Sequence, residues 1–360
     1  MKVAVLGGGH GAHAAAADLS EQGHQVRFWR RDGAALAPLL KTGRLTLTDA
    51  AGSRDVALHC VTAHIGEAVA GADLILMPGP ATAQVDIARA MAPHVGDGQG
   101  ILMPPGSFGT WLVVNTLRQR GCAADVLVGE SGTLPWLARM QGPAEVAIVT
   151  RATRLPTGVF PHARADAAFD LFQRAFPVIE RLTDGLDGAL MNAGPIIHPP
   201  LILMNAGPIE HFDHWDIHNE GTQPAIRRVT DALDAERIAV REALGYGAPH
   251  FPLADHYDDS RPEWMYGQAA HDRLVVSSRW RESLDLTRHR YMREDVAIGL
   301  AFLVSVARWA GVAAPVATGL LALASAINGE DFSRTGRTLE QLGLAQLTPV
   351  ALQARLRDGF

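Results

Sequence analysis

Short apolar runs alternate with helix-like segments along the first half of the chain. The apolar runs, rich in branched residues, are the predicted strands; they lie at 2–6, 25–29, 74–77, 100–103, 126–128 and 146–150. The segments 12–19, 84–91 and 110–118 have the composition of helices. Glycine and proline follow several of the strands directly. This repetition of strand, break and helix predicts a doubly wound α/β fold with a parallel sheet, in which ligands bind at the carboxyl ends of the strands.

The pattern changes at Asp184, where strand-like runs largely disappear and helix-like segments grow longer. A helix is predicted over 222–244, because a proline stands near its start, a glycine follows its end and apolar side chains form one stripe. Three more helices are predicted, over 294–310, over 315–327 and after Pro349. The second half of the chain is therefore expected to be mostly α-helical.

Length, composition and charge narrow the class of protein. The chain has 360 residues, of which 48% are hydrophobic and 19% charged, an ordinary balance for a soluble globular protein of two domains. The net charge of −6 argues against nucleic acid or an anionic membrane as a partner. No apolar run has the length of a membrane span, and a strand that begins at residue 2 leaves no room for a signal peptide. We expect a cytoplasmic protein with small-molecule ligands.

The two cysteines, Cys60 and Cys122, are too few for a disulfide framework or a cysteine metal site. Both are expected to be small buried residues. The sequence leaves the oligomeric state open, with a homodimer as the candidate assembly.

The turn between the first strand and the first helix carries a dinucleotide-binding pattern. Gly7, Gly9 and Ala12 match G-x-G-x-x-G/A, and the strand–turn–helix context is the one in which this match is informative. Gly7 permits the tight turn, Gly9 lets the backbone approach a pyrophosphate, and Ala12 allows close helix–strand packing. His10 and Gly11 complete the loop, whose helix N-terminus offers free N–H groups to phosphates. The alternative is a glycine-rich turn without a ligand.

The residues after the second strand bear on the choice of cofactor. An acidic residue about 20 positions after the fingerprint normally holds the ribose hydroxyls of NAD. Here Arg30 and Arg31 occupy that place, and Asp32 follows. Guanidinium groups pair with a 2′-phosphate, which an acid would repel. We therefore favour NADP(H) over NAD(H). The alternative is that both arginines are solvated and Asp32 serves NAD.

Three loops are expected at the carboxyl edge of the predicted sheet, at 78–84, 104–110 and 130–139. Each follows a predicted strand, so that its residues would face a bound dinucleotide. The alternative for most of these residues is turn chemistry alone.

Two stretches in the second half resemble the signatures of the opine dehydrogenase family, the octopine, nopaline and N-(1-carboxyethyl)norvaline dehydrogenases. Residues 196–201 read IIHPPL and continue to Asn205-Ala206; residues 290–296 read RYMREDV and continue to Gly299-Leu300. The first half is similar to the family as well, in VLGGGHGAHA at the fingerprint and at Pro80, Pro105 and Glu130. The resemblance covers almost the whole chain. It divides the chain into an NAD(P)-binding Rossmann domain, 1–183, and a helical substrate domain, 184–360.

The resemblance implies a reaction and the residues that perform it. In this family a 2-oxo acid condenses with the amino group of an amino acid, and a hydride from NAD(P)H reduces the product to a secondary amine dicarboxylate. Matched to the signatures, His198 is the acid/base, Asp295 its carboxylate partner and Arg290 the anchor of a substrate carboxylate; Pro80, Pro105 and Glu130 fall on the cofactor side. These roles suit the chemistry of the side chains.

Each of these residues also has a plain structural explanation. His198 is one of fifteen histidines, Asp295 could compensate a helix dipole, and Arg290 could be a surface charge.

The resemblance to the opine dehydrogenases assigns no role to a cluster of three histidines. His211, His214 and His218 lie in EHFDHWDIH, but their spacing matches no zinc pattern, and we expect no metal. The stretch could instead set amine specificity, and Trp215, Trp264 and Tyr266 could line an apolar amine pocket or simply be core residues.

Two alternative functions remain open. A keto-acid or ketone reductase of the same two-domain build would carry a catalytic lysine in its helical domain. The only lysines of this chain are Lys2 and Lys41, neither of which lies in the helical half, and this argues against such a reductase. A non-catalytic NADP(H)-sensing protein would bind the cofactor without hydride transfer.

Overall fold

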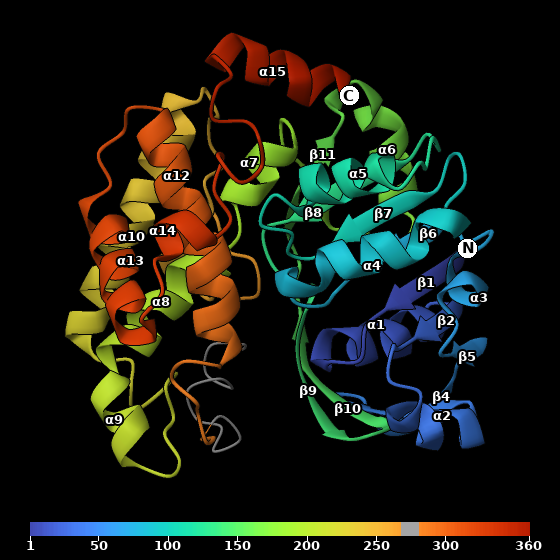
Figure 1. The fold of residues 1–360 in the computed structure, drawn as a ribbon. Helices are drawn as coiled ribbons and strands as arrows, with labels where there is room; N and C mark the ends of the chain where they lie inside the picture. The colour runs from blue at the N-terminus through green and yellow to red at the C-terminus, as the bar shows by residue number, and fades with distance from the viewer. Residues whose placement is uncertain (268–280) are drawn as a thin grey trace. The chain divides into compact units, whose positions relative to one another are not determined.

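The computed structural model describes residues 1–267 and 281–360 (Figure 1). Its internal contacts divide the chain into two compact units, one formed by Met1–Ala189 with Arg355–Phe360 and the other by Leu190–Ala354. The first unit ends slightly beyond the boundary that we placed at residue 183, and the last six residues pack with it rather than with the helical unit.

The first unit is built on an eight-stranded sheet. Its strands run in the order β12 (Ile179–Arg181), β11 (Leu155–Phe160), β8 (Leu127–Ser131), β7 (Gly100–Met103), β6 (Leu74–Leu76), β1 (Lys2–Leu6), β2 (Gln25–Trp29) and β5 (Cys60–Thr62). All neighbours are parallel except β11 and β8. The order reverses beside β1, as in doubly wound folds. The predicted α/β class with a parallel sheet is confirmed.

Helices cover this sheet and include all three that the pattern predicted. The α-helices are α1 (His10–Glu21), α2 (Ala37–Thr42), α3 (Ile65–Val69), α4 (Gln84–Met91), α5 (Gly109–Gln119), α6 (Ala165–Phe172) and α7 (Gly185–Leu190), joined by 3₁₀ turns η1 (Ala34–Leu36), η2 (Ala81–Ala83), η3 (Ala92–His94) and η4 (His162–Arg164).

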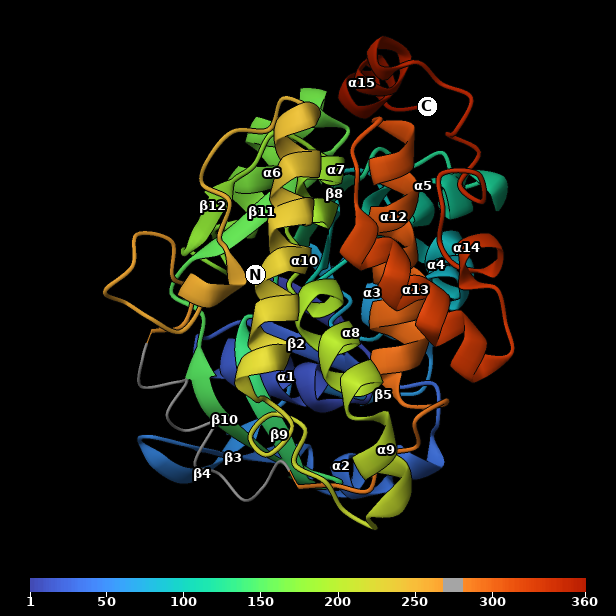
Figure 2. The same cartoon turned by 90° about the vertical axis from the view of Figure 1, so that its left-hand side faces the viewer.

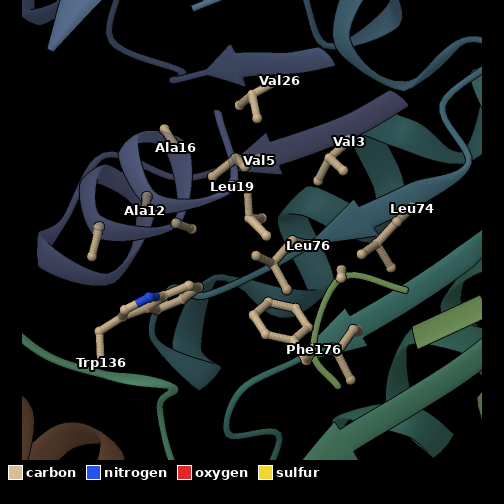
Figure 3. Packing of buried hydrophobic residues seen from close by; sticks show 14 of the residues in the cluster. Val3, Val5, Ala12, Ala16, Leu19, Val26, Leu74, Leu76, Trp136 and Phe176 are labelled. Carbon is tan, nitrogen blue, oxygen red and sulfur yellow. The ribbon is translucent and has the colours of Figure 1, made fainter. Parts of the chain in front are cut away.

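Small side chains let α1 approach the central strands closely. Ala12 and Ala16 are buried beside Val5 of β1, and Leu19 completes this face of the helix (Figure 3). Complete burial of a side chain such as Leu19 contributes about 1.5–3 kcal/mol. This packing fixes the N-terminus of α1 at the carboxyl end of β1.

A second, four-stranded sheet corrects two sequence predictions. Its order is β4 (Gly52–Ala57), β3 (Arg44–Asp49), β10 (Glu145–Arg151) and β9 (Trp136–Gly142). The strand predicted at 146–150 therefore lies in β10, outside the main sheet. The predicted loop 130–139 is also partly wrong, because Glu130 and Ser131 end β8 and β9 starts at Trp136. Neither the partner of a strand nor its sheet is encoded by local alternation.

The second unit is helical, as predicted. It contains α8 (Gly194–Met204), α9 (Ala206–His211), α10 (Pro224–Ala243), the 3₁₀ turn η5 (Leu253–Asp255), the π-helix η7 (Tyr291–Leu300), α12 (Ala301–Trp309), α13 (Pro315–Asn328), α14 (Phe332–Thr335) and α15 (Pro349–Asp358), whose last turn belongs to the first unit. The long helix α10 packs beside α8, and α8 packs against η7 (Figure 2). Among the described residues, no helix is long and apolar enough to cross a bilayer.

The helices predicted over 222–244 and 315–327 are confirmed as α10 and α13. The helix predicted after Pro349 is confirmed as α15, and Thr348 caps it, since the Thr348 hydroxyl accepts the N–H of Ala351 at 3.2 Å. The helix predicted from Glu294 begins earlier, at Tyr291, and its first ten residues have π rather than α geometry. Asp295 consequently lies inside that π-helix and not in the first turn of an α-helix.

Candidate active site

The helical unit brings together two of the predicted catalytic residues, which lie 97 positions apart in the chain. The Nδ1 atom of His198, on α8, is 2.8 Å from the Oδ2 atom of Asp295, on η7. The side chains are only 14% and 5% exposed. Of the two ring nitrogens, Nδ1 is bound to Asp295, and within the described residues Nε2 has no hydrogen-bond partner. The pair therefore presents a single imidazole nitrogen for proton transfer.

Two glycines allow α8 and η7 to approach closely enough for this contact. A β-carbon at Gly194 would collide with the Oδ1 atom of Asp295, and one at Gly299 would collide with the ring of Pro195. Each helix thus contributes one glycine at the point where the other presses against it. We attribute the short His198–Asp295 distance to this packing.

The π geometry of η7 determines which side chains share a face. In an α-helix, residues five positions apart are separated by roughly 140° around the axis. In a π-helix, in which hydrogen bonds join residues five apart, such residues lie on the same side, and π turns are frequent at functional sites. Arg290 directly precedes η7, five positions before Asp295. The irregular geometry therefore serves to place both groups on one side of the helix.

Of the three residues predicted to be catalytic, Arg290 is the one exposed to solvent. Its side chain is 58% exposed, and its Nε atom is 3.6 Å from the Oε2 atom of the largely buried Glu294. Its guanidinium also lies 5.9 Å from the centre of the Tyr291 ring. The structure thus places Arg290 at the rim, next to the His198–Asp295 pair.

Burial shifts the pKa of both members of the pair toward their neutral forms. Burial lowers the pKa of His198 well below its usual value, and the charge of Arg290 acts in the same direction. Burial raises the pKa of Asp295 to about 7, against the opposing charges of Arg290 and His289. His198 is consequently a neutral base at physiological pH, with its proton on Nδ1 wherever Asp295 is ionised.

Two further residues belong to this site that the candidate set did not include. The ring of Tyr291 stacks on the His198 imidazole, with centroids 3.7 Å apart and planes at 12°. The Tyr291 hydroxyl is 2.8 Å from the Nε2 atom of His218. Both residues were visible in the sequence, Tyr291 inside the second signature and His218 inside the histidine cluster, but nothing local indicated that they meet.

The rest of the histidine cluster lies elsewhere. His211 and His214 are exposed, and within the described residues no group of three His, Cys, Asp or Glu side chains could hold a metal ion. The loop that carries His218 is tied to the end of α8, because Trp215 donates from its indole Nε1 to the buried amide of Asn205 at 3.0 Å. Trp215 also stacks on Phe212.

Of the other two aromatic residues considered for an amine pocket, Tyr266 is buried against Tyr257, and Trp264 is half-buried.

The fingerprint loop of the first unit has two kinds of glycine. A β-carbon at Gly9 would meet no atom within 4 Å, whereas one at Gly11 would lie 2.8 Å from the carbonyl oxygen of Pro78. Gly7 adopts a φ of +148° and a β-carbon there would lie 3.3 Å from that of Ala12. Gly9 therefore leaves open space at the start of α1, and Gly7, Gly11 and Ala12 pack the turn. His10 accepts the N–H of Met140 at 2.9 Å through its Nδ1 atom.

The two arginines after β2 differ in their surroundings. The Arg30 side chain lies over Gly8, where a β-carbon would come within 2.6 Å of its Nε atom. Arg31 points to solvent and forms an exposed ion pair with Asp86 at 3.5 Å. Asp32 caps the following turn, since its Oδ1 accepts the N–H groups of Ala34 and Ala35 at 3.0 and 3.2 Å. Arg30 is thus the cation beside the glycine loop.

Glu130 is fully buried and supports the neighbouring loop from within. Its carboxylate accepts the N–H of Phe108 at 2.7 Å and the hydroxyl of Thr110 at 2.6 Å, at the start of α5. Phe108 has a φ of +63°, a conformation that such a bulky residue adopts only when its surroundings enforce it. Pro80 is exposed and Pro105 half-buried at the two adjoining loops. Glu130 therefore holds the backbone of this loop and the start of α5 in place.

A doubly wound domain with a dinucleotide loop, followed by a helical domain that holds a buried histidine–carboxylate pair, defines a class: the two-domain NAD(P)-dependent oxidoreductases. Comparison with known proteins narrows this class. A family described as NAD/NADP octopine/nopaline dehydrogenase, alpha-helical domain, matches residues 182–328. An opine dehydrogenase of Arthrobacter sp. (strain 1C) is 29% identical over 357 residues, which cover 98% of this chain and 97% of that protein.

Two solved structures are similar over almost the whole chain. Octopine dehydrogenase in complex with NADH and agmatine has a TM-score of 0.72 and 21% identity, and the match covers 100% of this chain and 98% of that one. Yersinopine dehydrogenase with NADP⁺ bound has a TM-score of 0.70 and 16% identity, over 99% of both chains. At these identities the structures establish a shared fold.

The resemblance to the opine dehydrogenases is thereby confirmed. Residues 182–328 match the octopine/nopaline dehydrogenase family, and the chain is an NAD(P)-dependent oxidoreductase that acts on CH–NH groups.

Proposed function

We propose that this protein condenses a 2-oxo acid with the amino group of an amino acid and reduces the product to a secondary amine dicarboxylate. The observation that carries the proposal is the buried His198–Asp295 pair, in which Nε2 is the nitrogen left for proton transfer. The balanced overall reaction consumes the oxo acid, the ammonium group, NAD(P)H and one proton. It produces the protonated secondary amine, NAD(P)⁺ and water. Bound NAD(P)H supplies the hydride.

His198 is the proposed acid/base. As a neutral imidazole it accepts a proton from the substrate ammonium group at Nε2, which frees the nitrogen lone pair to attack the oxo carbon. The same imidazolium then returns the proton to the hydroxyl group that leaves as water. Asp295 holds the Nδ1 proton and stabilises the imidazolium between these two transfers.

Arg290 is the proposed anchor for a substrate carboxylate. Both substrates carry a carboxylate, and a guanidinium group at the rim of the site matches its geometry with two parallel hydrogen bonds. The exposed position of Arg290 leaves its donors accessible to a ligand.

The first unit is the proposed cofactor domain and the helical unit the substrate domain. The open space at Gly9 and the N-terminus of α1 suit a pyrophosphate, and we propose NADP(H) as the preferred form. Two observations support this preference: the Arg30 guanidinium lies beside the loop, and the nearby carboxylate of Asp32 is used as a turn cap. Against NAD(H), no other carboxylate directly follows β2.

The test follows the absorbance of NADPH, and separately of NADH, with pyruvate or 2-oxoglutarate, in the presence and absence of a panel of L-amino acids. Oxidation that requires both an oxo acid and an amine supports the proposal, and the His198→Ala variant should then lose it. Oxidation with the oxo acid alone would instead make the protein a keto-acid reductase. Tight cofactor binding without oxidation by any pair would favour a sensing role.

A further inference from the structure

The imidazole of His198 is enclosed by an aromatic ring as well as by a carboxylate. Tyr291, the first residue of the π-helix, is 7% exposed and lies parallel to the imidazole at a centroid distance of 3.7 Å. That distance is shorter than the usual separation of paired aromatic rings, so the two planes are in full contact. One face of His198 is therefore stacked on the Tyr291 ring.

Tyr291 is itself fixed by His218. Its hydroxyl is 2.8 Å from the Nε2 atom of His218, and the His218 ring stands nearly perpendicular to that of Tyr291, at 88°. The backbone of His218 is anchored in turn, because its N–H donates to the Oδ1 atom of Asp216 at 3.1 Å. A loop that follows the first signature thus holds the ring that covers the catalytic candidate.

The loop that carries His218 is braced at both ends. Trp215 forms backbone hydrogen bonds with Glu282 in both directions, at 3.1 and 3.4 Å. Arg281 donates to Glu220 at 2.5 Å. These contacts join the loop to the segment that leads into Tyr291, so that His218 and Tyr291 are held as one assembly.

We propose that Tyr291 and His218 are positioning residues for His198: the Tyr291 ring and the Asp295 carboxylate together restrict the imidazole to one orientation, with Nε2 directed at the substrate. The inference rests on the proposed acid/base role of His198. The Tyr291 hydroxyl is bonded to His218, which assigns the tyrosine to support rather than to proton transfer. Misplacement of a reacting group by about 1 Å can cost up to 10²-fold in rate, which makes such support valuable.

The kinetic test separates the ring from its hydroxyl. Tyr291→Leu removes the stacked ring and should lower kcat by roughly tenfold or more, with the KM of the oxo acid changed less than about threefold. Tyr291→Phe keeps the ring and should retain most of kcat. His218→Leu should fall between these variants, and His218→Gln, which can still bond the tyrosine hydroxyl, should recover activity toward wild type. His214→Leu, in the exposed part of the same cluster, is the matched control.

A second measurement decides the inference independently of turnover. Selective ¹⁵N labelling of histidine, with the His198 signals assigned by their loss in His198→Ala, reports the tautomer of the imidazole. At a pH above that at which Asp295 ionises, wild type and Tyr291→Phe should show the Nδ1–H tautomer. In Tyr291→Leu the imidazole is no longer held against Asp295, so its signals should be averaged over the two tautomers.

Failure of the proposed function and failure of the positioning role would give different experimental results. A wild-type enzyme without oxidation dependent on both substrates would overturn the proposed function, while the tautomer measurement would still decide whether Tyr291 orders His198. An active wild type whose Tyr291→Leu variant keeps both kcat and a single tautomer would overturn the positioning role. A variant with an altered circular dichroism spectrum would be replaced by Tyr291→Met, which keeps bulk without a ring.

Discussion

The candidate site of the first unit is formed mainly by backbone, whereas that of the helical unit is formed by side chains. In the first unit the candidate cofactor loop is mostly backbone: one glycine leaves space, others pack the turn, and a helix N-terminus lies at the loop. In the helical unit the site is made of side chains drawn from α8, from η7 and from a separate loop. A backbone site tolerates exchange of most side chains around it. A side-chain site depends on a few specific groups and on the contacts that hold them.

An ion pair of the first unit and the buried groups of the helical unit illustrate two ways of shifting a pKa. In the first unit the pKa of Asp49 is lowered chiefly by its hydrogen bonds to Arg54, an ion pair near the surface. In the helical unit the pKa values of His198, His256 and Asp295 are shifted chiefly by burial. Charge pairing favours the ionised form of Asp49, whereas burial favours the neutral forms of the three side chains in the helical unit.

The largest effect is expected from Asp295→Asn. The amide cannot hold the Nδ1 proton and stabilise the imidazolium as a carboxylate does, so kcat should fall by about 10²–10⁴-fold. Stopped-flow or steady-state oxidation of NAD(P)H with both substrates measures the loss. Asp213→Asn, an exposed carboxylate of the same unit, should remain near wild type.

The same variant has a stability signature with a definite sign. Because the folded pKa of Asp295, about 7, lies above the unfolded value of about 3.9, the folded state binds the proton more tightly. Wild-type stability should therefore fall as pH rises from about 4 to 7, relative to the variant. Equal pH dependence of the unfolding free energy in the two proteins would contradict this assignment.

Much of the first unit could be predicted from sequence because its signals are local. Strand β1, the glycine turn and α1 occupy the first 21 residues, and each is encoded by its own composition. The four-stranded sheet could not be predicted in this way, because Thr46 of β3 pairs with Glu145 of β10. Such pairing depends on contacts between distant segments, which no local pattern records.

The candidate catalytic pair illustrates the same limit more sharply. His198 and Asp295 were selected by resemblance to a family, and their contact depends on the glycines that allow α8 to press on η7. The stacking of Tyr291 on His198 was invisible to either argument. Tyr291 begins the π-helix η7, whereas the sequence pattern predicts an ordinary helix that begins three residues later.

Arg30→Ala tests whether a side chain matters in the backbone-built site. Loss of a charged hydrogen bond to a 2′-phosphate costs about 1.5–3 kcal/mol, so the Kd of NADPH should rise roughly ten- to 100-fold. The Kd of NADH should change less than about threefold. Fluorescence titration with each nucleotide gives both values.

Arg31→Ala is the matched control, since Arg31 is exposed and paired with Asp86. Equal weakening of NADH and NADPH by Arg30→Ala would show that Arg30 supports the loop at Gly8 and does not select the cofactor.

Acid should weaken the helical unit through His256. This residue is 2% exposed, its Nε2 atom is 3.1 Å from the Phe251 carbonyl oxygen, and burial lowers its pKa to about 4. The unfolded chain binds the proton near pH 6.5, so stability should decline as pH falls from about 6.5 to 4. Between pH 7 and pH 5 this contribution is about 2 kcal/mol.

Urea unfolding of wild type and His256→Gln at the two pH values isolates the contribution, because glutamine can still donate to Phe251 but does not titrate. The variant should lose less stability on acidification than wild type. His211→Gln, at an exposed site of the same unit, should behave as wild type, and a loss of stability as large in His256→Gln as in wild type would exclude His256 as the source.

The smallest effects distinguish two glycines of one loop. A methyl group at Gly11 would meet the Pro78 carbonyl oxygen at 2.8 Å and the Leu134 side chain at 3.0 Å. Alanine favours the helix more than glycine does, but the steric clash is larger, so Gly11→Ala should lower the unfolding free energy by about 1–2 kcal/mol. Gly9→Ala meets no protein atom within 4 Å and should leave the unfolding free energy within about 0.5 kcal/mol of wild type. It should nevertheless weaken NADH and NADPH alike, because the methyl group takes the space beside the pyrophosphate. Thermal melts and nucleotide titrations of both variants measure the two quantities. If Gly9→Ala bound both nucleotides as tightly as wild type does, the loop would be a turn without a ligand. The comparison between a site made of backbone and a site made of side chains would then be wrong for the first unit.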